Sequence, residues 1–140
     1  MTRPVPLAAL LVLALVAGCR THTPTQPATP AAAPVSVKAG DLLKDYGGNA
    51  LAADKKYKGQ VLRVTGKFGS VQKAPLIGYT LQLLPEDAGD ISLSAVQCVL
   101  EESAQSAAAE LKEGQTVTIQ GTCDGQVVGQ VKLSHCTVVK

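Results

Sequence analysis

Alternating apolar and polar residues predict two β-strands that share a nine-residue pattern. Residues 58–66 read KGQVLRVTG and residues 113–121 read EGQTVTIQG, so a Gly-Gln pair precedes each alternation and a glycine ends it. Successive side chains of a strand point to opposite faces, and both segments therefore fit strands with one buried face. We call this shared pattern the nine-residue echo, and one such echo is too little for a repeat protein. We expect two equivalent strands of one barrel, with the glycines at bulges or corners.

Helical spacing precedes the first of these strands. Between residues 37 and 57, apolar side chains recur at intervals of three and four and are interrupted by two glycines. This pattern predicts short helices over about 39–46 and 49–55. Asn49 stands where a side chain can cap the second helix.

The remaining segments complete the predicted order of elements. An antiparallel pair of strands is expected at residues 79–84 and 91–100, and a helix at 101–112. A turn follows the second nine-residue strand at 122–125, and the last strand is expected at 131–139. Short helices, three strands, a helix and two strands follow the connectivity of the OB barrel. The predicted fold is mainly β, a five-stranded OB-fold barrel preceded by short N-terminal helices.

Several segments carry a resemblance to a known family. These are DLLKDYGGNALAADKKYKGQVLRVTG, SAVQC, LKEGQTVTIQGTCDG and VKLSHC, and the likeness covers about residues 37–140. They resemble the family of OB-fold lipoproteins, also called the tRNA-anti-like domain. The resemblance implies an envelope lipoprotein of uncharacterised role, because the family takes its name from similarity in fold to anticodon-binding domains.

The N-terminus carries an apolar run that ends at a cysteine. Leu7 to Val16 has the length and position of the apolar part of a secretory signal, and Ala17-Gly18-Cys19 follows it. The run is shorter than the roughly 20 residues that span a bilayer. We expect residues 1–18 to be a lipoprotein signal peptide and Cys19 to be the lipid attachment site, where the thiol takes diacylglycerol. The alternative, a buried N-terminal helix, would need a second apolar surface to cover it.

A proline-rich segment separates this signal from the domain. Residues 19–36 are expected to form a lipidated tether, because proline at this density favours extended chain. The domain follows at 37–140. Arg20, the second residue of the processed chain, is not the Asp associated with inner-membrane retention in some bacteria. The expected location is the cell envelope, lipid-anchored at the outer membrane and facing the periplasm. In an organism with one membrane, it would be the outer face of that membrane.

Charge and composition narrow the partners. From Val35 onward, 11 Lys and Arg residues balance 11 Asp and Glu residues, whereas binding to a polyanion needs an excess of cations. We expect no nucleic acid, no cofactor and no metal. His135 and Cys136 are adjacent in a strand and point to opposite faces, which does not favour a shared metal ion. The expected partners are the membrane, through Cys19, and an envelope protein or a glycan.

Three cysteines remain for an exported, oxidising compartment: Cys98, Cys123 and Cys136. In an OB barrel the third and fifth strands are parallel neighbours about 4.8 Å apart, so Cys98 and Cys136 would fall within the bridging range of roughly 4.4 to 6.8 Å. We predict a Cys98–Cys136 disulfide, with three free thiols as the alternative. Cys123 is expected at the end of its strand, in a turn.

No catalytic motif accompanies these features, and the sequence predicts a non-catalytic OB-fold binding module rather than an enzyme. One alternative is a thiol-active envelope accessory that uses Cys123, and it requires a reactive, accessible thiol. A minor alternative is an OB domain that binds nucleic acid or a glycan. It would need aromatic side chains on the second and third strands, where the sequence offers Tyr79 alone.

Overall fold

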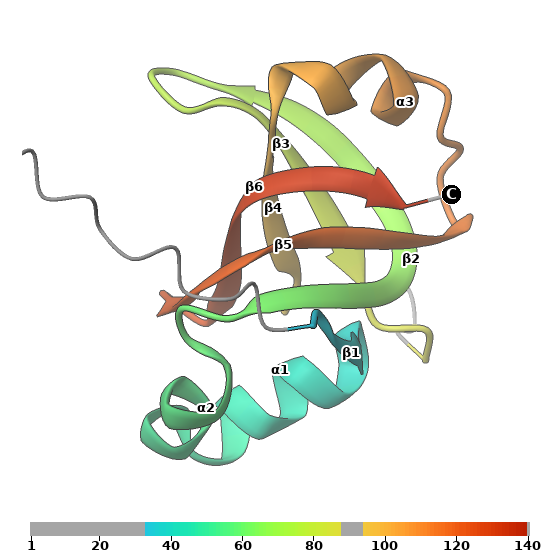
Figure 1. The fold of residues 1–140 in the computed structure, drawn as a ribbon. Helices are drawn as coiled ribbons and strands as arrows, with labels where there is room; N and C mark the ends of the chain where they lie inside the picture. Colours follow the sequence, from blue (N-terminus) through green and yellow to red (C-terminus); the bar gives the residue numbers. More distant parts are fainter. Residues whose placement is uncertain (1–32, 88–93, 140) are drawn as a thin grey trace, which may run out of the picture.

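The computed structural model describes residues 33–87 and 94–139, which contain six strands, two α-helices before the barrel and a short helix within it (Figure 1). The predicted signal peptide, Cys19 and most of the tether lie outside the described residues, as do residues 91–93 of the expected strand. The elements are β1 (Val35–Lys38), α1 (Ala39–Gly48), α2 (Ala50–Tyr57), β2 (Val61–Ala74), β3 (Gly78–Leu84), β4 (Val96–Leu100), a 3-10 turn (Glu102–Ala104), α3 (Gln105–Ala109), β5 (Thr116–Val127) and β6 (Gln130–Val139).

Five of the strands close into a barrel. The order is β2-β3-β4-β6-β5, and β5 pairs with β2 to complete the ring. All of these pairs are antiparallel except β4 and β6, which are parallel. The parallel pair is the one expected for the third and fifth strands of an OB barrel. The predicted fold is confirmed.

Helices close the barrel at both ends, with α1 and α2 at one end and α3 at the other (Figure 1). Ala39, Leu42, Leu43 and Tyr46 of α1 are buried in the core, which is otherwise built mainly from Val, Leu and Ile of the strands. The predicted cap is confirmed, because the Asn49 side chain accepts a hydrogen bond of 3.1 Å from the Ala52 backbone amide at the start of α2.

The strands extend beyond their predicted bounds at two places. β1 pairs in parallel with β2 from Val35 onward, so it includes two residues that the sequence pattern assigned to the tether. The predicted turn at 122–125 is wrong: β5 continues to Val127, and Cys123 lies within the strand opposite Leu133. The pairing shifts register between Cys123 and Gly125, and Gly125 has φ +99°. A bulge in a strand uses the same Asp-Gly residues as a turn.

The two strands of the nine-residue echo pair with each other. Leu62 of β2 lies opposite Gly121 of β5, and Gly66 lies opposite Val117. A Cβ atom on Gly66 would lie 2.7 Å from the Leu84 carbonyl oxygen, and one on Gly121 would lie 2.6 Å from the Cys136 Sγ and 2.9 Å from the Ser134 carbonyl oxygen. Both glycines permit a close approach of neighbouring backbone, as expected for corners of the barrel.

We expect Gly121→Ala to lower the free energy of unfolding by about 1 to 3 kcal/mol, because the added methyl group must displace strand backbone as well as the Cys136 side chain. Urea unfolding followed by circular dichroism measures the change. The matched control is Gly47→Ala in α1, where an added Cβ meets nothing within 4 Å, and where alanine stabilises a helix by up to about 1 kcal/mol. Equal stability of the two variants would contradict the assigned role of Gly121.

Candidate functional site

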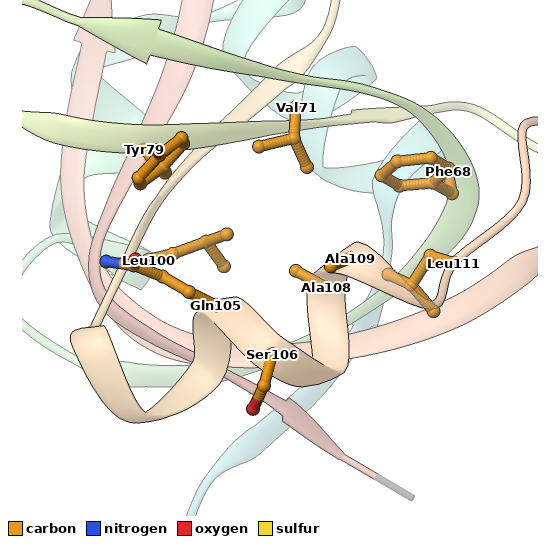
Figure 2. A pocket seen from close by; sticks show the side chains of 9 residues that line it. All are labelled: Phe68, Val71, Tyr79, Leu100, Gln105, Ser106, Ala108, Ala109 and Leu111. Carbon is orange, nitrogen blue, oxygen red and sulfur yellow. The ribbon is translucent and has the colours of Figure 1, made fainter.

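An apolar groove of about 500 Å³ lies between the bent strand β2, the start of β3 and the helix α3 (Figure 2). Phe68, Val71 and Tyr79 line one wall, and residues of α3 and the segment after it line the other. Figure 2 shows the strand side chains facing Ala108, Ala109 and Leu111 across the space. The full lining is Phe68, Val71, Tyr79, Leu100, Gln105, Ser106, Ala108, Ala109 and Leu111.

A β-bulge aims the strand wall of the groove. Residues three apart in a regular strand point to opposite faces, yet Phe68 and Val71 both face the groove. The pairing of β2 with β3 shifts register between Phe68 and Ser70, which places Gly69 as the extra residue and restores the same side for both neighbours. Phe68 and Leu100 are buried beneath the opening, whereas Tyr79 is 37% exposed at its rim.

The helix wall is open because its side chains are small. Ala108 is buried against the core and Ala109 is exposed at the mouth of the groove. Besides the Tyr79 hydroxyl, the polar side chains of the lining are those of Gln105 and Ser106, and Figure 2 shows the Ser106 hydroxyl pointing away from the strands. A concave, mostly apolar surface of this size is the usual form of a site that binds apolar groups. Sequence patterns missed this site because its residues come from three separate elements.

The three cysteines of the domain are buried in the barrel core as free thiols. Cys98 pairs with Leu133, and Cys136 pairs with Leu100, so the two cysteines are diagonal rather than directly opposite across β4 and β6. The Cys98 thiol forms a hydrogen bond with Cys136, and this bond together with burial raises the pKa of Cys98 well above its ordinary value. The structure thus brings together the two cysteines that the sequence analysis paired.

Cys123 takes part in a short network of polar side chains. The Tyr46 hydroxyl donates to the Asp54 Oδ1 at 3.1 Å, and it lies 3.4 Å from the Cys123 Sγ. A tyrosine hydroxyl has one hydrogen to donate, so the Cys123 thiol is the donor to the Tyr46 oxygen. Burial raises the pKa of Tyr46, and its contacts with Cys123 and Asp54 raise it further.

A second hollow, of about 630 Å³, lies between β1 and the two N-terminal helices and is lined largely by charged side chains. Lys56 and Tyr57 donate hydrogen bonds of 2.9 and 2.7 Å to the same Asp45 oxygen. These two bonds, that of Lys56 first, hold the pKa of Asp45 below its ordinary value. Lys56 and Asp45 therefore satisfy each other within this hollow, and its lining is polar where that of the groove is apolar.

The described residues were also compared with the requirements of a metal site and of a membrane-spanning helix. Within residues 33–87 and 94–139, no group of three His, Cys, Asp or Glu side chains is placed to hold a metal ion. His135 is exposed and Cys136 is buried, so the two point to opposite faces as predicted. No helix in the described part of the chain is long and apolar enough to cross a membrane.

We expect Cys123 to resist alkylation by iodoacetamide in the folded protein, since its side chain is 1% exposed and the reactive species is the thiolate. The measurement is mass-spectrometric peptide mapping after alkylation at mildly alkaline pH, with and without urea. A Leu76→Cys variant is the control, because that position is fully exposed and should react at the rate of a free thiol. Equal rates at positions 76 and 123 would show that Cys123 is accessible.

Comparisons with known proteins agree with this architecture. Comparison with curated proteins gave no match. The fold is similar to a solved structure from Klebsiella pneumoniae that is described as a "putative nucleic acid-binding lipoprotein"; the TM-score is 0.62 and the identity 18%, over 76% of this chain and 92% of that one. At this identity the likeness concerns the fold alone. The sequence model of the tRNA_anti-like family matches residues 1–137, and the chain therefore belongs to the tRNA_anti-like family.

Proposed function

We propose that this protein is a lipid-anchored protein of the cell envelope whose OB barrel binds an apolar segment of a partner protein without catalysing a reaction. The observation that carries the proposal is the groove between β2, β3 and α3, which holds about 500 Å³ and has an apolar floor. A glycan is a poorer fit, because its hydroxyl groups require polar partners and the lining offers few.

The anchor is proposed on the sequence of the leader. An apolar run precedes Ala17-Gly18-Cys19, and the similar structure from Klebsiella pneumoniae is also described as a lipoprotein. Residues 1–18 would be removed and Cys19 would carry the lipid. Arg20 at the second position favours the outer membrane, with the domain in the periplasm.

Binding is favoured over thiol chemistry by the state of Cys123. A nucleophilic cysteine is partly exposed and has a stabilised thiolate. Cys123 is buried, and its thiol donates a hydrogen bond to the Tyr46 hydroxyl, which in turn donates one to Asp54. Because only 1% of its side chain is exposed, the Cys123 thiol is closed off from any substrate, and the alternative of a thiol-active accessory has little support in this geometry.

Nucleic-acid binding is a second candidate because the similar Klebsiella structure is described as nucleic acid-binding. Single strands bind OB barrels through aromatic stacking and a basic groove. The residues of β3 and β4 that alternate with the buried ones are Thr80, Gln82, Leu84, Gln97 and Val99. This face offers hydrogen bonds but no aromatic side chain on which a base could stack. The apolar groove is therefore the better-supported binding site.

We further propose that Cys98 and Cys136 form a disulfide in the envelope. The parallel register of β4 and β6 places them diagonally across the two strands, and oxidation would proceed during folding by exchange with the disulfide of an envelope oxidoreductase. The two thiols lose two protons and two electrons, and the oxidoreductase disulfide is reduced to a dithiol. A disulfide that closes the stretch of chain between Cys98 and Cys136 would stabilise the domain by about 3 to 4 kcal/mol in the chain-entropy model.

Intact-mass spectrometry of protein extracted from membranes tests the anchor and the bridge together. We expect loss of residues 1–18, a lipid-sized mass increase at Cys19, and one thiol alkylated in urea before reduction but three after it. The alkylated thiol should be Cys123. Cys19→Ser should lack the lipid, whereas the control Cys123→Ser should keep it. An intact leader would refute the anchor, and three thiols alkylated before reduction would refute the bridge.

Titration with the neutral fluorophore N-phenylnaphthylamine tests the groove. We expect Ala109→Lys to weaken binding by about tenfold or more, because a long charged side chain then occupies the apolar mouth, and a tenfold change corresponds to about 1.4 kcal/mol. The matched control is Ser103→Lys, which adds the same charge at an exposed position outside the lining. Equal affinities of the two variants would exclude the groove. Tight binding of a fluorescent single-stranded oligonucleotide would instead favour the second candidate.

A further inference from the structure

We propose that the tips of the two long hairpins contact the surface of a lipid bilayer, an inference that rests on the proposed anchor at Cys19. The tip of the β2–β3 hairpin carries Leu76, which is fully exposed, and Ile77, which is half-exposed. The tip of the β5–β6 hairpin carries Val127 and Val128, and Val128 is 97% exposed. Figure 1 shows both hairpins projecting on the same side of the barrel.

The backbone conformation of both turns disfavours the apolar residues that occupy them. Val127 pairs with Gln130, so the β5–β6 turn has two central residues, Val128 and Gly129, and both have positive φ, 49° and 77°. A turn of this type favours Asn or Asp before the glycine, and a β-branched residue there is uncommon. Leu76 also has a positive φ, 69°. Polar residues would fit both backbones better and would be solvated, so apolar residues at both tips indicate a contact.

The neck of the β2–β3 hairpin has the charge and the aromatic group that suit a bilayer interface. Between Gly66 and Leu84 the only charged residues are Lys67 and Lys73. The Lys73 Nζ lies 6.0 Å from the centroid of the Tyr79 ring. Tyrosine prefers the interface between headgroups and acyl chains, and lysine extends its ammonium group to anionic headgroups. The apolar tip would enter the outer part of the bilayer, with this pair at headgroup level.

The surface between the tips is polar, which favours a bilayer over a continuous protein interface. The strands β3, β4 and β6 join the two hairpins, and Gln97 of β4 lies opposite Gln82 of β3 and Lys132 of β6. The Gln97 amide also donates to the Gln130 side chain. The two apolar tips would enter the bilayer separately, and the row of side-chain amides between them would face the hydrated headgroups.

The tether joins the domain at β1, which lies beside the start of β2. Val35 begins β1 opposite Leu62, which lies opposite Gly121 of β5. From Gly121, β5 continues toward Val127 and its hairpin tip, so the chain enters the domain level with the middle of β5, six residues before Val127. Extended proline-rich chain spans about 3.1 Å per residue. The predicted tether of residues 20–34 would then be long enough to let the tips reach the membrane that holds the anchor.

Single tryptophans can report the contact, because the chain contains no tryptophan. Leu76→Trp and Val128→Trp place a reporter at each tip. Glu113→Trp is the matched control, since it lies in the exposed segment before Thr116, at the opposite end of β5 from Val128. Each lipidated full-length variant is reconstituted in vesicles of phosphatidylethanolamine and phosphatidylglycerol, with and without lipids brominated in the acyl chains.

We expect both tip reporters to emit at shorter wavelength on vesicles and to lose emission with brominated lipid, whereas the Glu113→Trp reporter changes in neither respect. Adding Leu76→Ser should restore the water-exposed spectrum of the Val128→Trp reporter if the tips enter together. Co-flotation of the proteins with the vesicles separates the two proposals. Protein that does not float refutes the anchor. Protein that floats with unquenched, water-exposed tips refutes the bilayer contact.

Discussion

The bend of β2 is the constraint on which the rest of the domain depends. Residues 61–67 of this strand pair with β5, and residues 67–74 pair with β3, so one strand changes its partner while it turns a corner. Gly66 makes the corner possible, because any side chain there would collide with the Leu84 carbonyl and with Ala39. The bulge at Gly69 then adds one residue and turns the next side chains toward α3. Barrel closure, the strand wall of the groove and the projecting hairpin all follow from this bend.

The backbone at Gly121 makes room for the side chain of Cys136 in the core. The space above this glycine is filled by the Cys136 Sγ, and Cys136 in turn meets Cys98. Few aromatic residues are available, and Tyr46 is the largest fully buried side chain among the described residues. Its hydroxyl would be left unsatisfied in an apolar core, and Asp54 and Cys123 supply its partners. The network that satisfies this hydroxyl also holds α1 and α2 against β5.

Periodicity predicted the elements whose apolar residues alternate regularly, and it failed where the backbone departs from regular geometry. The echo strands and the helix cap at Asn49 were predictable because each is encoded within a few adjacent residues. The continuation of β5 past Cys123 was not, because Asp124-Gly125 reads as a turn and becomes a bulge only when β6 pairs beside it. β1 is four residues long and mostly exposed, so it has no periodic signal. The groove has none either, because a β2 bulge and an alanine-rich helix create it jointly.

The alanines of α3 suggest that the groove is maintained against stability. Ala108 faces Val71 across an open space, and a leucine there could cover apolar surface at about 25 cal/mol for each Å² removed from water. Filling such spaces is one of the commonest ways to stabilise a small domain. The short helix instead presents small side chains over Phe68 and Leu100, and Tyr79 at the rim stays 37% exposed. A binding partner that supplies the missing apolar surface would complete this layer of the core, which is the physical reason to regard the groove as a recognition site.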